Sequence, residues 1–520
     1  MQTDQINLPG NYGRGTPRPG FRLDKYTVAW TLLFAVIGFL VIFGLSGVVL
    51  RFGKFGILAA VAVVIVAPIG VYSAIVAVPQ LLGKLGVIRS KLRWWHALWL
   101  LLYISSLVFR VRHQEETQAE PLDAWALFRI VPEMIVFGWL MVRLYQRRDA
   151  IRWLRCLFQG LTGALTTFAL VCLASTFWSV YPAWTLFKSL EYLLDISVLA
   201  VALANIYTLD DYQDLFNWTW TIFGCELAWV WLQVPLWPSE SFVDGRIKGF
   251  LPATGCNAVG QSGAFLAVIA LCRLFPLEGR RSNTPFNLVL CAFGLVSLLL
   301  SQTRNAIGGF ALGALLVLIA SRRIWLLVLS SVVGAMTWFL TPLGGIALAY
   351  LEREQSSAAM ASVTGRLPLW QFAWEQFLQH PLTGMGAYAA GRFYIMSKMG
   401  VDPASLHSDW VELLVGTGLA GLIPFLLVIF GTWWFLFRGI YDKSLDPRGR
   451  QLALEGIGVM AVITVHSFFN VELIWHVPLL LFVLMGYAEV LRRRRKNVMV
   501  PRPLPSILAR SSPQTRYGTS

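Results

Sequence analysis

The sequence predicts an all-α protein that crosses a membrane many times. Of its 520 residues, 56% are hydrophobic and 14% are charged, and the mean hydropathy is +0.61. Soluble domains carry about a quarter of charged residues, so this composition lies outside the globular range. The hydrophobic residues also form long blocks, and about 20 apolar residues suffice to cross a bilayer as a helix. The strands of a membrane barrel would be shorter and would alternate with polar residues.

The chain contains about 12–14 apolar segments that fit membrane-spanning helices. They are residues 26–50, 55–82, 94–109, 124–142, 157–176, 186–206, 214–234, 257–275, 284–302, 306–320, 324–341, 409–436, 452–470 and 473–490. Residues 1–25 are polar and rich in Gly and Pro, which predicts a disordered tail rather than a cleavable signal peptide. Residues 26–490 therefore form one transmembrane domain, and the basic residues 491–520 are expected to be a second disordered tail.

The distribution of charge predicts how this domain is oriented. The net charge is +15, and the basic residues cluster in short connections such as 84–93, 143–155, 273–281, 438–450 and 492–496. Cytoplasmic loops of membrane proteins carry such an excess of Lys and Arg. With the N-terminal tail inside, every second connection carries a basic cluster, except the acidic connection 208–214. Both termini are then cytoplasmic, and the net charge does not indicate nucleic-acid binding.

Two of the connections predicted to lie outside are longer than the others. Residues 234–256 contain Arg246 and Lys248, and residues 342–408 form a large loop between two spans. Within this loop, Leu367 to Leu378 carries apolar residues at helical spacing, and Pro381 with two glycines follows. We therefore expect a partly helical cap on the outer side. Loops of such length in compact proteins are usually functional.

Charged residues inside the apolar segments are candidates for function by default. Arg129 and Glu133 are four residues apart, which predicts an ion pair on one helix face. Three further charged residues share a face and could border a ligand cavity: Lys188, Glu191 and Asp195. Glu226 lies in the next segment. These charges are also the strongest argument that the protein is a transporter.

Some motifs point to functions that the sequence does not otherwise support. Residues 416–421 spell GxGxxG, but no strand precedes them and an apolar helix follows, so small residues for close helix packing are the better interpretation. No D-x-D sequence lies near an outside loop, so a metal-dependent nucleotide-sugar enzyme is not indicated. The cysteines show no CxxC spacing, and we expect neither a metal site nor a cofactor.

Four motifs together resemble those of the bacterial O-antigen ligase family. The first is His407-Ser408, nine residues, Gly418, two residues and Gly421. The others are Thr364-Gly365-Arg366 with Trp370 and the stretch from His380 to Gly386; Ser301-Gln302-Thr303-Arg304; and Arg246 with Gly249 and Asn257. The resemblance covers roughly residues 160 to 490, with no single motif decisive. The departures are a longer N-terminal region and Ser408, where the family more often has Asn.

The resemblance implies an enzyme that joins lipid-linked glycans on the outer face of the bacterial inner membrane. Members of the family attach O-antigen to lipid A-core, lengthen polysaccharides, or glycosylate proteins, and their donor is a glycan on undecaprenyl diphosphate. They resemble C-type glycosyltransferases that need no metal. The implied partners are this donor, a polysaccharide or lipid A-core acceptor, membrane lipids and other polysaccharide assembly proteins. Residues 26–490 would then be a transmembrane catalytic domain.

The chemistry of such a donor accounts for the two arginines. A diphosphate needs cationic hydrogen-bond donors to hold its oxygens and to stabilise it as it leaves, and the planar guanidinium group suits this task. Arg246 and Arg304 lie at membrane edges on the predicted outer side, where positive charge is disfavoured. We interpret them as the diphosphate-binding residues. The alternative is that each interacts with anionic lipid headgroups.

His407 is the candidate general base, because the acceptor hydroxyl must lose its proton as it attacks the anomeric carbon. It directly precedes a predicted span, and Asp409 and Glu412 are spaced like a capping box there. The helix N-terminus favours neutral imidazole, whereas the two carboxylates oppose this. Arg366, Asn257, Asp409 and Glu412 are expected supporting residues. The alternative for His407 is an interfacial residue that only caps the helix.

The sequence thus favours transfer of a glycan from undecaprenyl diphosphate with inversion at the anomeric carbon. Ligase and polymerase remain nearly balanced, because both share these motifs and differ in the acceptor. The additional N-terminal spans favour a polymerase-like role slightly. A flippase for lipid-linked glycans and a protein O-oligosaccharyltransferase remain alternatives.

Overall fold

The structure, a computed structural model, describes residues 93–107, 116, 119, 123–146, 150–206, 208–243, 245–278, 284–340, 345, 366–400, 405–474 and 478–495. The predicted spans 26–50 and 55–82, the predicted tail 1–25 and most of the predicted tail 491–520 lie outside these residues. The last described helix ends at Arg495, so it extends into the segment that the sequence assigned to the C-terminal tail.

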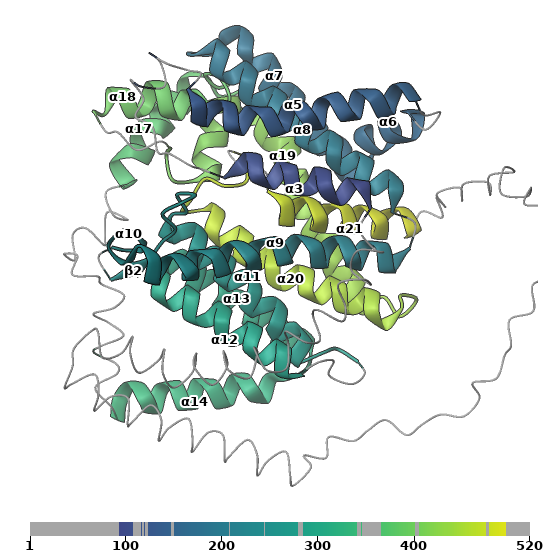
Figure 1. Ribbon diagram of the computed structural model, residues 1–520, viewed down its shortest axis with the longest axis vertical. Helices are drawn as coiled ribbons and strands as arrows, with labels where there is room; N and C mark the ends of the chain where they lie inside the picture. The colour runs from purple at the N-terminus through teal and green to yellow at the C-terminus, as the bar shows by residue number, and fades with distance from the viewer. Residues whose placement is uncertain are drawn as a thin grey trace, which may run out of the picture.

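The described residues are almost entirely helical (Figure 1). The first helices are α3 (Trp94–Ser106), α5 (Ala124–Gln146), α6 (Ala150–Phe158), α7 (Gly160–Ala174), η2 (Ser175–Trp178), α8 (Pro182–Asn205), α9 (Leu209–Leu236) and α10 (Pro238–Ser241). A short antiparallel hairpin follows, β1 (Phe242–Val243) with β2 (Arg246–Ile247), in which Val243 faces Arg246. The later helices are α11 (Cys256–Leu274), α12 (Thr284–Ser301), α13 (Arg304–Ala320), α14 (Ile324–Leu340), α17 (Arg366–Gln379), η3 (Ala390–Ile395), α18 (Met396–Lys398), α19 (Asp409–Tyr441), α20 (Pro447–Ser467) and α21 (Leu479–Arg495).

These helices confirm the prediction of an all-α polytopic membrane protein. By length and composition, five of the described helices can cross a membrane: α5, the stretch from α7 through η2, α11, α12 and α19. Each predicted span that falls on described residues corresponds to a helix, with ends shifted by a few residues. The helix expected from Leu367 to Leu378 is α17.

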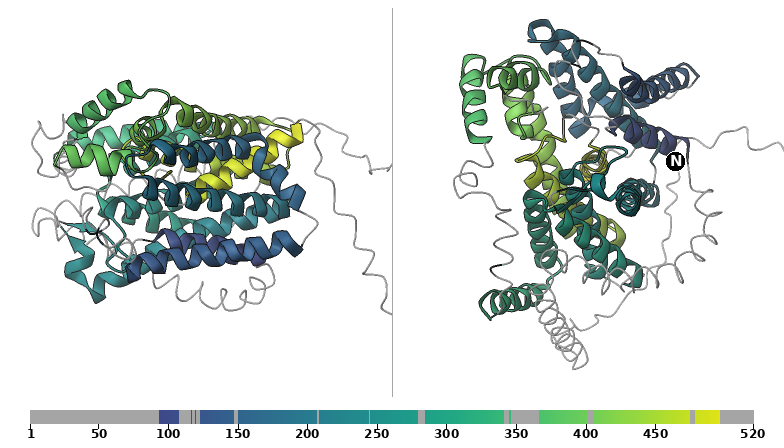
Figure 2. Two further views of the ribbon diagram at one scale, coloured as in Figure 1. Left: turned by 90° about the horizontal axis from the view of Figure 1, so that it is seen from above. Right: turned by 60° about the vertical axis from the view of Figure 1, so that its left-hand side comes forward.

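The helices lie side by side in a bundle, with α14 at its periphery (Figures 1 and 2). The hairpin strand β2 and helix α10 lie at the same end of the bundle as α17 and α18 (Figure 1). We call this the loop end. The described parts of both long connections that the sequence assigned to the outer side therefore lie at one end of the bundle, which is where their motifs could form one site. That this end faces outward stays a prediction.

Helix α11 is the centre of the part of the bundle that carries the site. In its most apolar stretch 72% of the residues are buried, against 17% in α5. It packs closely on α12, because a Cβ atom added to Gly263 would lie 2.7 Å from the carbonyl oxygen of Gly294. Small residues allow helix backbones to approach in this way within membranes. This close contact lies in the N-terminal half of α11.

Helix α19 is broken at Gly418, within the signature of the sequence motif. Gly418 has φ 58° and ψ −156°, a region that only glycine occupies readily. The backbone amides of Leu419 and Ala420 donate to the carbonyls of Pro381 and Leu382 at 2.8 and 3.0 Å. The glycine-rich run was predicted to serve helix packing; instead it admits a loop, whose backbone replaces the missing helical hydrogen bonds.

Replacing Gly418 with alanine is expected to destabilise the protein. A Cβ atom there would lie 2.6 Å from the Leu382 carbonyl carbon, and the backbone conformation costs a non-glycine residue about 1–3 kcal/mol. Thermal unfolding in detergent should show a clear fall in Tm. The control is Gly334→Ala in α14, where a Cβ atom meets nothing within 4 Å. Equal Tm values for the two variants would contradict the kink.

The buried charges correct one prediction. Arg129 does not pair with Glu133 on its own helix; its guanidinium lies 2.7 Å from Oε1 of Glu191 on α8. Lys188 pairs with the same carboxylate. The spacing of four residues predicted a pair within α5. In the structure, Glu191 on the neighbouring helix α8 pairs with both Arg129 and Lys188 instead. Lys188, Glu191 and Asp195 are buried and share one region with Glu133, as their common face suggested, but they do not line the polar cavity described below.

Candidate active site

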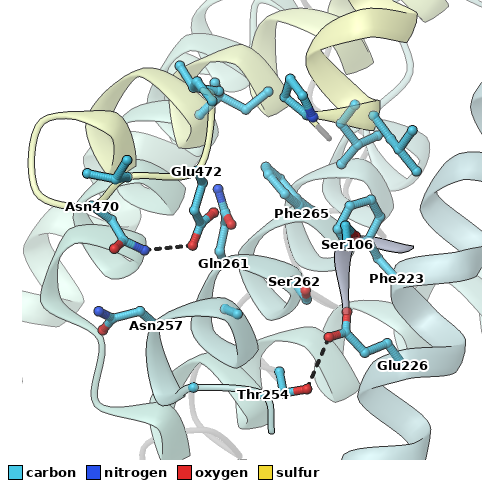
Figure 3. A pocket seen from close by; sticks show the side chains of 18 of the residues that line it. Ser106, Phe223, Glu226, Thr254, Asn257, Gln261, Ser262, Phe265, Asn470 and Glu472 are labelled. Carbon is cyan, nitrogen blue, oxygen red and sulfur yellow. Dashed lines mark hydrogen bonds between the residues drawn. The ribbon is translucent and has the colours of Figure 1, made fainter. Parts of the chain in front are cut away.

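A polar cavity of about 410 Å³ opens at the loop end between α3, α9, α11 and the segments that flank α19 and α20. Polar side chains from five parts of the chain line it (Figure 3). They are Tyr103, Ser106, Glu226, Thr254, Asn257, Gln261, Ser262, Ser405, His407, Asn470 and Glu472. Cavities of roughly 300–1,000 Å³ hold small organic ligands.

The composition of this lining restricts what the cavity can bind. The lining residues include two carboxyl groups, hydroxyls, amides and one imidazole, but neither Lys nor Arg. Phe223 and Phe265 add apolar surface beside the polar groups (Figure 3). A diphosphate would lack a cationic partner here, whereas a sugar offers both hydroxyl donors and an apolar face. The cavity therefore combines hydrogen-bonding groups with apolar surface and suits a sugar better than a diphosphate.

His407 is presented to the cavity by a strained backbone. Its φ is 55°, an uncommon conformation for any residue other than glycine. The peptide before it is held on both sides: the amide of Leu406 donates to Glu412 at 2.7 Å, and the indole of Trp370 donates to the Leu406 carbonyl at 2.8 Å. Strain of this kind persists only where the surroundings fix it, and it is frequent at active sites.

The imidazole of His407 is neutral at neutral pH. Burial lowers its pKa, and the positive charge of Arg366 lowers it further, to about 4. From the sequence, the direction of the pKa shift of His407 was open, because the helix dipole and the two nearby carboxylates act in opposite directions. In the structure, burial of the side chain determines this direction. A neutral imidazole can accept a proton from a hydroxyl group, which is the state that a general base requires.

Asp409 and Glu412 hold the backbone instead of forming the predicted capping box. The helix begins at Asp409 as expected, but the side chain of its N-cap Ser408 makes no capping hydrogen bond. The Asp409 carboxylate accepts from the amide of Leu473 at 3.1 Å, and the Asp409 amide donates to the carbonyl of Asn470 at 3.1 Å. Asp409 therefore ties the start of α19 to the segment that follows α20, and Glu412 fixes the peptide of Leu406.

Arg246 and Arg304 come from different motifs and meet at the turn between α12 and α13. Arg246 lies on β2, and its Nε donates to the carbonyl of Ser301, the last residue of α12, at 2.9 Å. Arg304 is the first residue of α13. The Gln302 side chain donates to the Gly245 carbonyl at 3.1 Å, which joins the turn to the hairpin. Both arginines thus belong to the N-terminal region of α13, a location that favours anions.

The arginine cluster and the polar cavity share the N-terminus of α11. The hydroxyl of Thr303, next to Arg304, donates to the carbonyl of Cys256 at 2.9 Å. Asn257, the following residue, lines the cavity that His407 also lines. The arginines themselves are not among the residues that line the cavity. The structure therefore provides a cationic region and, beside it, a cavity whose lining contains neither Lys nor Arg.

Arg366 joins the cap to the same region. It begins α17, and its guanidinium donates to the carbonyl of Phe469 at 2.7 Å. Burial lowers its pKa. Its charge acts on His407, but Arg366 does not line the cavity, so it supports the geometry and electrostatics of the site rather than binding a ligand within it.

Several cavity residues were not predicted as site residues from the sequence. Glu472 and Asn470 lie between two apolar segments, in the run Phe469-Asn470-Val471-Glu472, and Gln261 lies inside α11. Polar residues at the end of a membrane helix are too common to indicate a site by themselves. No group of three or more His, Cys, Asp or Glu side chains suited to a metal occurs in the part of the chain that the structure describes.

Comparisons with known proteins agree with the motifs. Residues 289–426 match the family model described as O-Antigen ligase. This segment contains Arg304, Arg366, His407 and both signature glycines, whereas Arg246, Asn257 and Glu472 lie outside it. The exopolysaccharide production protein ExoQ of Rhizobium meliloti is 26% identical over 362 residues, which cover 65% of this chain and 78% of that protein.

Proposed function

We propose that this chain, which belongs to the O-antigen ligase and polysaccharide polymerase family, transfers a glycan from undecaprenyl diphosphate to a sugar acceptor. The transfer takes place on the outer face of the inner membrane, without a metal, and inverts the anomeric carbon. The protein is thus a multi-pass membrane glycosyltransferase of the ligase or polymerase type.

The main support for this proposal is that two arginines and a cavity without Lys or Arg lie beside each other at the N-terminus of α11. Arg246 and Arg304 offer guanidinium groups to a diphosphate. Nε of Arg246 donates to Ser301, which leaves its two terminal nitrogens to contact the diphosphate. The adjoining cavity has no cation and suits sugar hydroxyls. A sugar held between the two regions would have its diphosphate on one side and an acceptor hydroxyl on the other.

This arrangement supports a single displacement. His407 accepts the proton of the acceptor hydroxyl, whose oxygen attacks the anomeric carbon from the side opposite the diphosphate. The bond from the anomeric carbon to the diphosphate breaks, and the arginines stabilise the charge of the leaving group. Attack opposite the leaving group inverts the configuration. The relative named for exopolysaccharide production favours a growing polysaccharide as acceptor over lipid A-core.

A transporter of lipid-linked glycans is the alternative class, and the buried charges of α5 and α8 are the observation that favours it. Two of these cations, Arg129 and Lys188, both pair with Glu191. This arrangement accounts for the charges as contacts between two helices and weakens the case for an ion pathway.

Purified protein in nanodiscs tests the proposal. Given a lipid-diphosphate glycan and an acceptor oligosaccharide, it is expected to form a glycosidic bond without ATP and in the presence of EDTA. Mass spectrometry of the product detects the bond. Redistribution of the donor between the two leaflets with no new glycosidic bond would contradict a transferase and favour a flippase.

A further inference from the structure

Two carboxyl groups line the polar cavity, and the mechanism above uses neither (Figure 3). Glu226 is engaged by hydroxyl groups at both oxygens, by Tyr103 at one and by Thr254 at the other, at 3.3 Å. Glu472 is held by amides: Asn470 donates to its Oε1 at 2.6 Å, and the Gln261 side chain also hydrogen-bonds to it. Its Oε2 lies 3.5 Å from Nδ1 of His466, longer than a good hydrogen bond.

Glu472 is also fixed relative to His407. Asp409, two residues after His407, accepts hydrogen bonds from the backbone amides of Glu472 at 3.4 Å and Leu473 at 3.1 Å. The hydroxyl of Tyr192 donates to the Leu473 carbonyl at 3.2 Å from the other side. The carboxyl group of Glu472 is therefore held in the same cavity as the imidazole, and its own side chain remains 21% exposed.

We propose that Glu472 is the final acceptor of the proton that His407 takes from the attacking hydroxyl. This inference rests on the transferase function proposed above. As the new bond to the anomeric carbon forms and the diphosphate leaves with the bonding electrons, the proton moves from the hydroxyl to the imidazole. In the same step the Glu472 carboxylate, which lines the same cavity, takes the proton from the imidazole, and the proton leaves for solvent when the product departs.

The acidities of the two groups give this transfer its direction. Burial raises the pKa of Glu472 to about 8, whereas that of His407 is lowered to about 4. Since each pKa unit is a factor of ten, a proton shared between them favours Glu472 by roughly 10⁴. The charged or titratable groups that act on Glu472 are His466 on α20, Glu226 on α9 and Asp409 on α19. His407 lines the same cavity, and Arg366 on α17 acts on His407.

The consequence is a pH dependence that His407 alone would not produce. Only ionised Glu472 can receive the proton, so the rate should rise with pH through about 8. With His407 as the sole proton acceptor, the rate would be level above about pH 5, because the imidazole is already neutral there. A diphosphate diester carries no group that titrates in this range.

The test is the initial rate of transfer by protein in nanodiscs between about pH 5 and pH 9, for wild type and for Glu472→Gln. At pH 8 the transfer rate of the variant is expected to be at least about tenfold below that of wild type, and it should no longer rise with pH. Glu472→Asp should retain the rise at a reduced rate. The control is Glu375→Gln on the exposed face of α17, which should behave as wild type.

Three results would overturn the inference and leave the transferase function in place. A level wild-type profile contradicts it directly, even if Glu472→Gln fails to fold. A Glu472→Gln protein that is slower at every pH but keeps the rise assigns Glu472 a purely structural role. A Glu472→Gln protein with the wild-type rate would show that Glu472 has no role in the transfer reaction. Absence of product from wild type at every pH contradicts the proposed transferase function itself, and this inference with it.

Discussion

Arg246→Ala and Arg304→Ala are each expected to lower the rate of glycan transfer by about 10²–10³-fold, the usual effect of removing one donor to a transition-state charge. Arg246 contacts the turn between α12 and α13, and Arg304 is the first residue of α13, where the diphosphate would lie. Lysine should restore little activity, because an ammonium group cannot make the planar two-point contact of a guanidinium. Transfer measured with purified, folded variants tests this.

Lys248→Ala provides the matched control for the arginines. It removes one positive charge from the segment that follows β2, but it is not a residue assigned to the diphosphate. If the arginines bind the donor specifically, this variant should retain most of the activity. An equal loss in Lys248→Ala would mean that net charge or the stability of the hairpin matters, rather than two defined contacts.

The second large effect is expected at His407. His407→Asn and His407→Gln should lower the chemical rate by about 10²–10⁴-fold, as loss of one general base does, while donor binding is retained. Asparagine is the more informative variant, because it tolerates the left-handed backbone conformation that His407 adopts at φ 55°. Single-turnover rates with saturating donor measure the effect.

A folded His407→Asn protein with the wild-type rate would contradict this assignment. His407 would then position the acceptor or shape the loop. Asp409 and Glu412 would be poor replacements as the base, because both carboxylates already bind backbone amides. The remaining carboxyl groups of the cavity, Glu226 and Glu472, would be the next candidates.

The fold was predictable because membrane helices are determined mainly by long apolar segments. The ends of α11, α12 and α13 fall within a few residues of the predicted ones. The cap helix α17 followed from its helical spacing. The Gly418 kink was not predictable, since a glycine that breaks a helix and one that packs against a neighbour look alike in one sequence. The loop from Pro381 to Gly386 decides between them.

The site was predictable in part, for a related reason. His407 and the arginines belong to motifs, but the partner of a buried charge depends on packing between helices. Arg129 therefore pairs with Glu191 and not with Glu133. Glu472 entered the site only through the cavity that it shares with His407, because no spacing along the chain relates residues 407 and 472. The backbone amide of Glu472 donates to the Asp409 side chain, and this hydrogen bond joins the two segments that carry His407 and Glu472.

The most direct test of the account is donor binding without turnover. A labelled lipid-diphosphate glycan should be titrated, without acceptor, into nanodiscs carrying wild type, His407→Asn or the double variant Arg246→Ala/Arg304→Ala. We expect wild-type affinity for His407→Asn and at least about tenfold weaker binding for the double arginine variant. Wild-type affinity in the arginine variant, or lost binding in His407→Asn, would contradict the division of the site into a diphosphate region and an acceptor cavity.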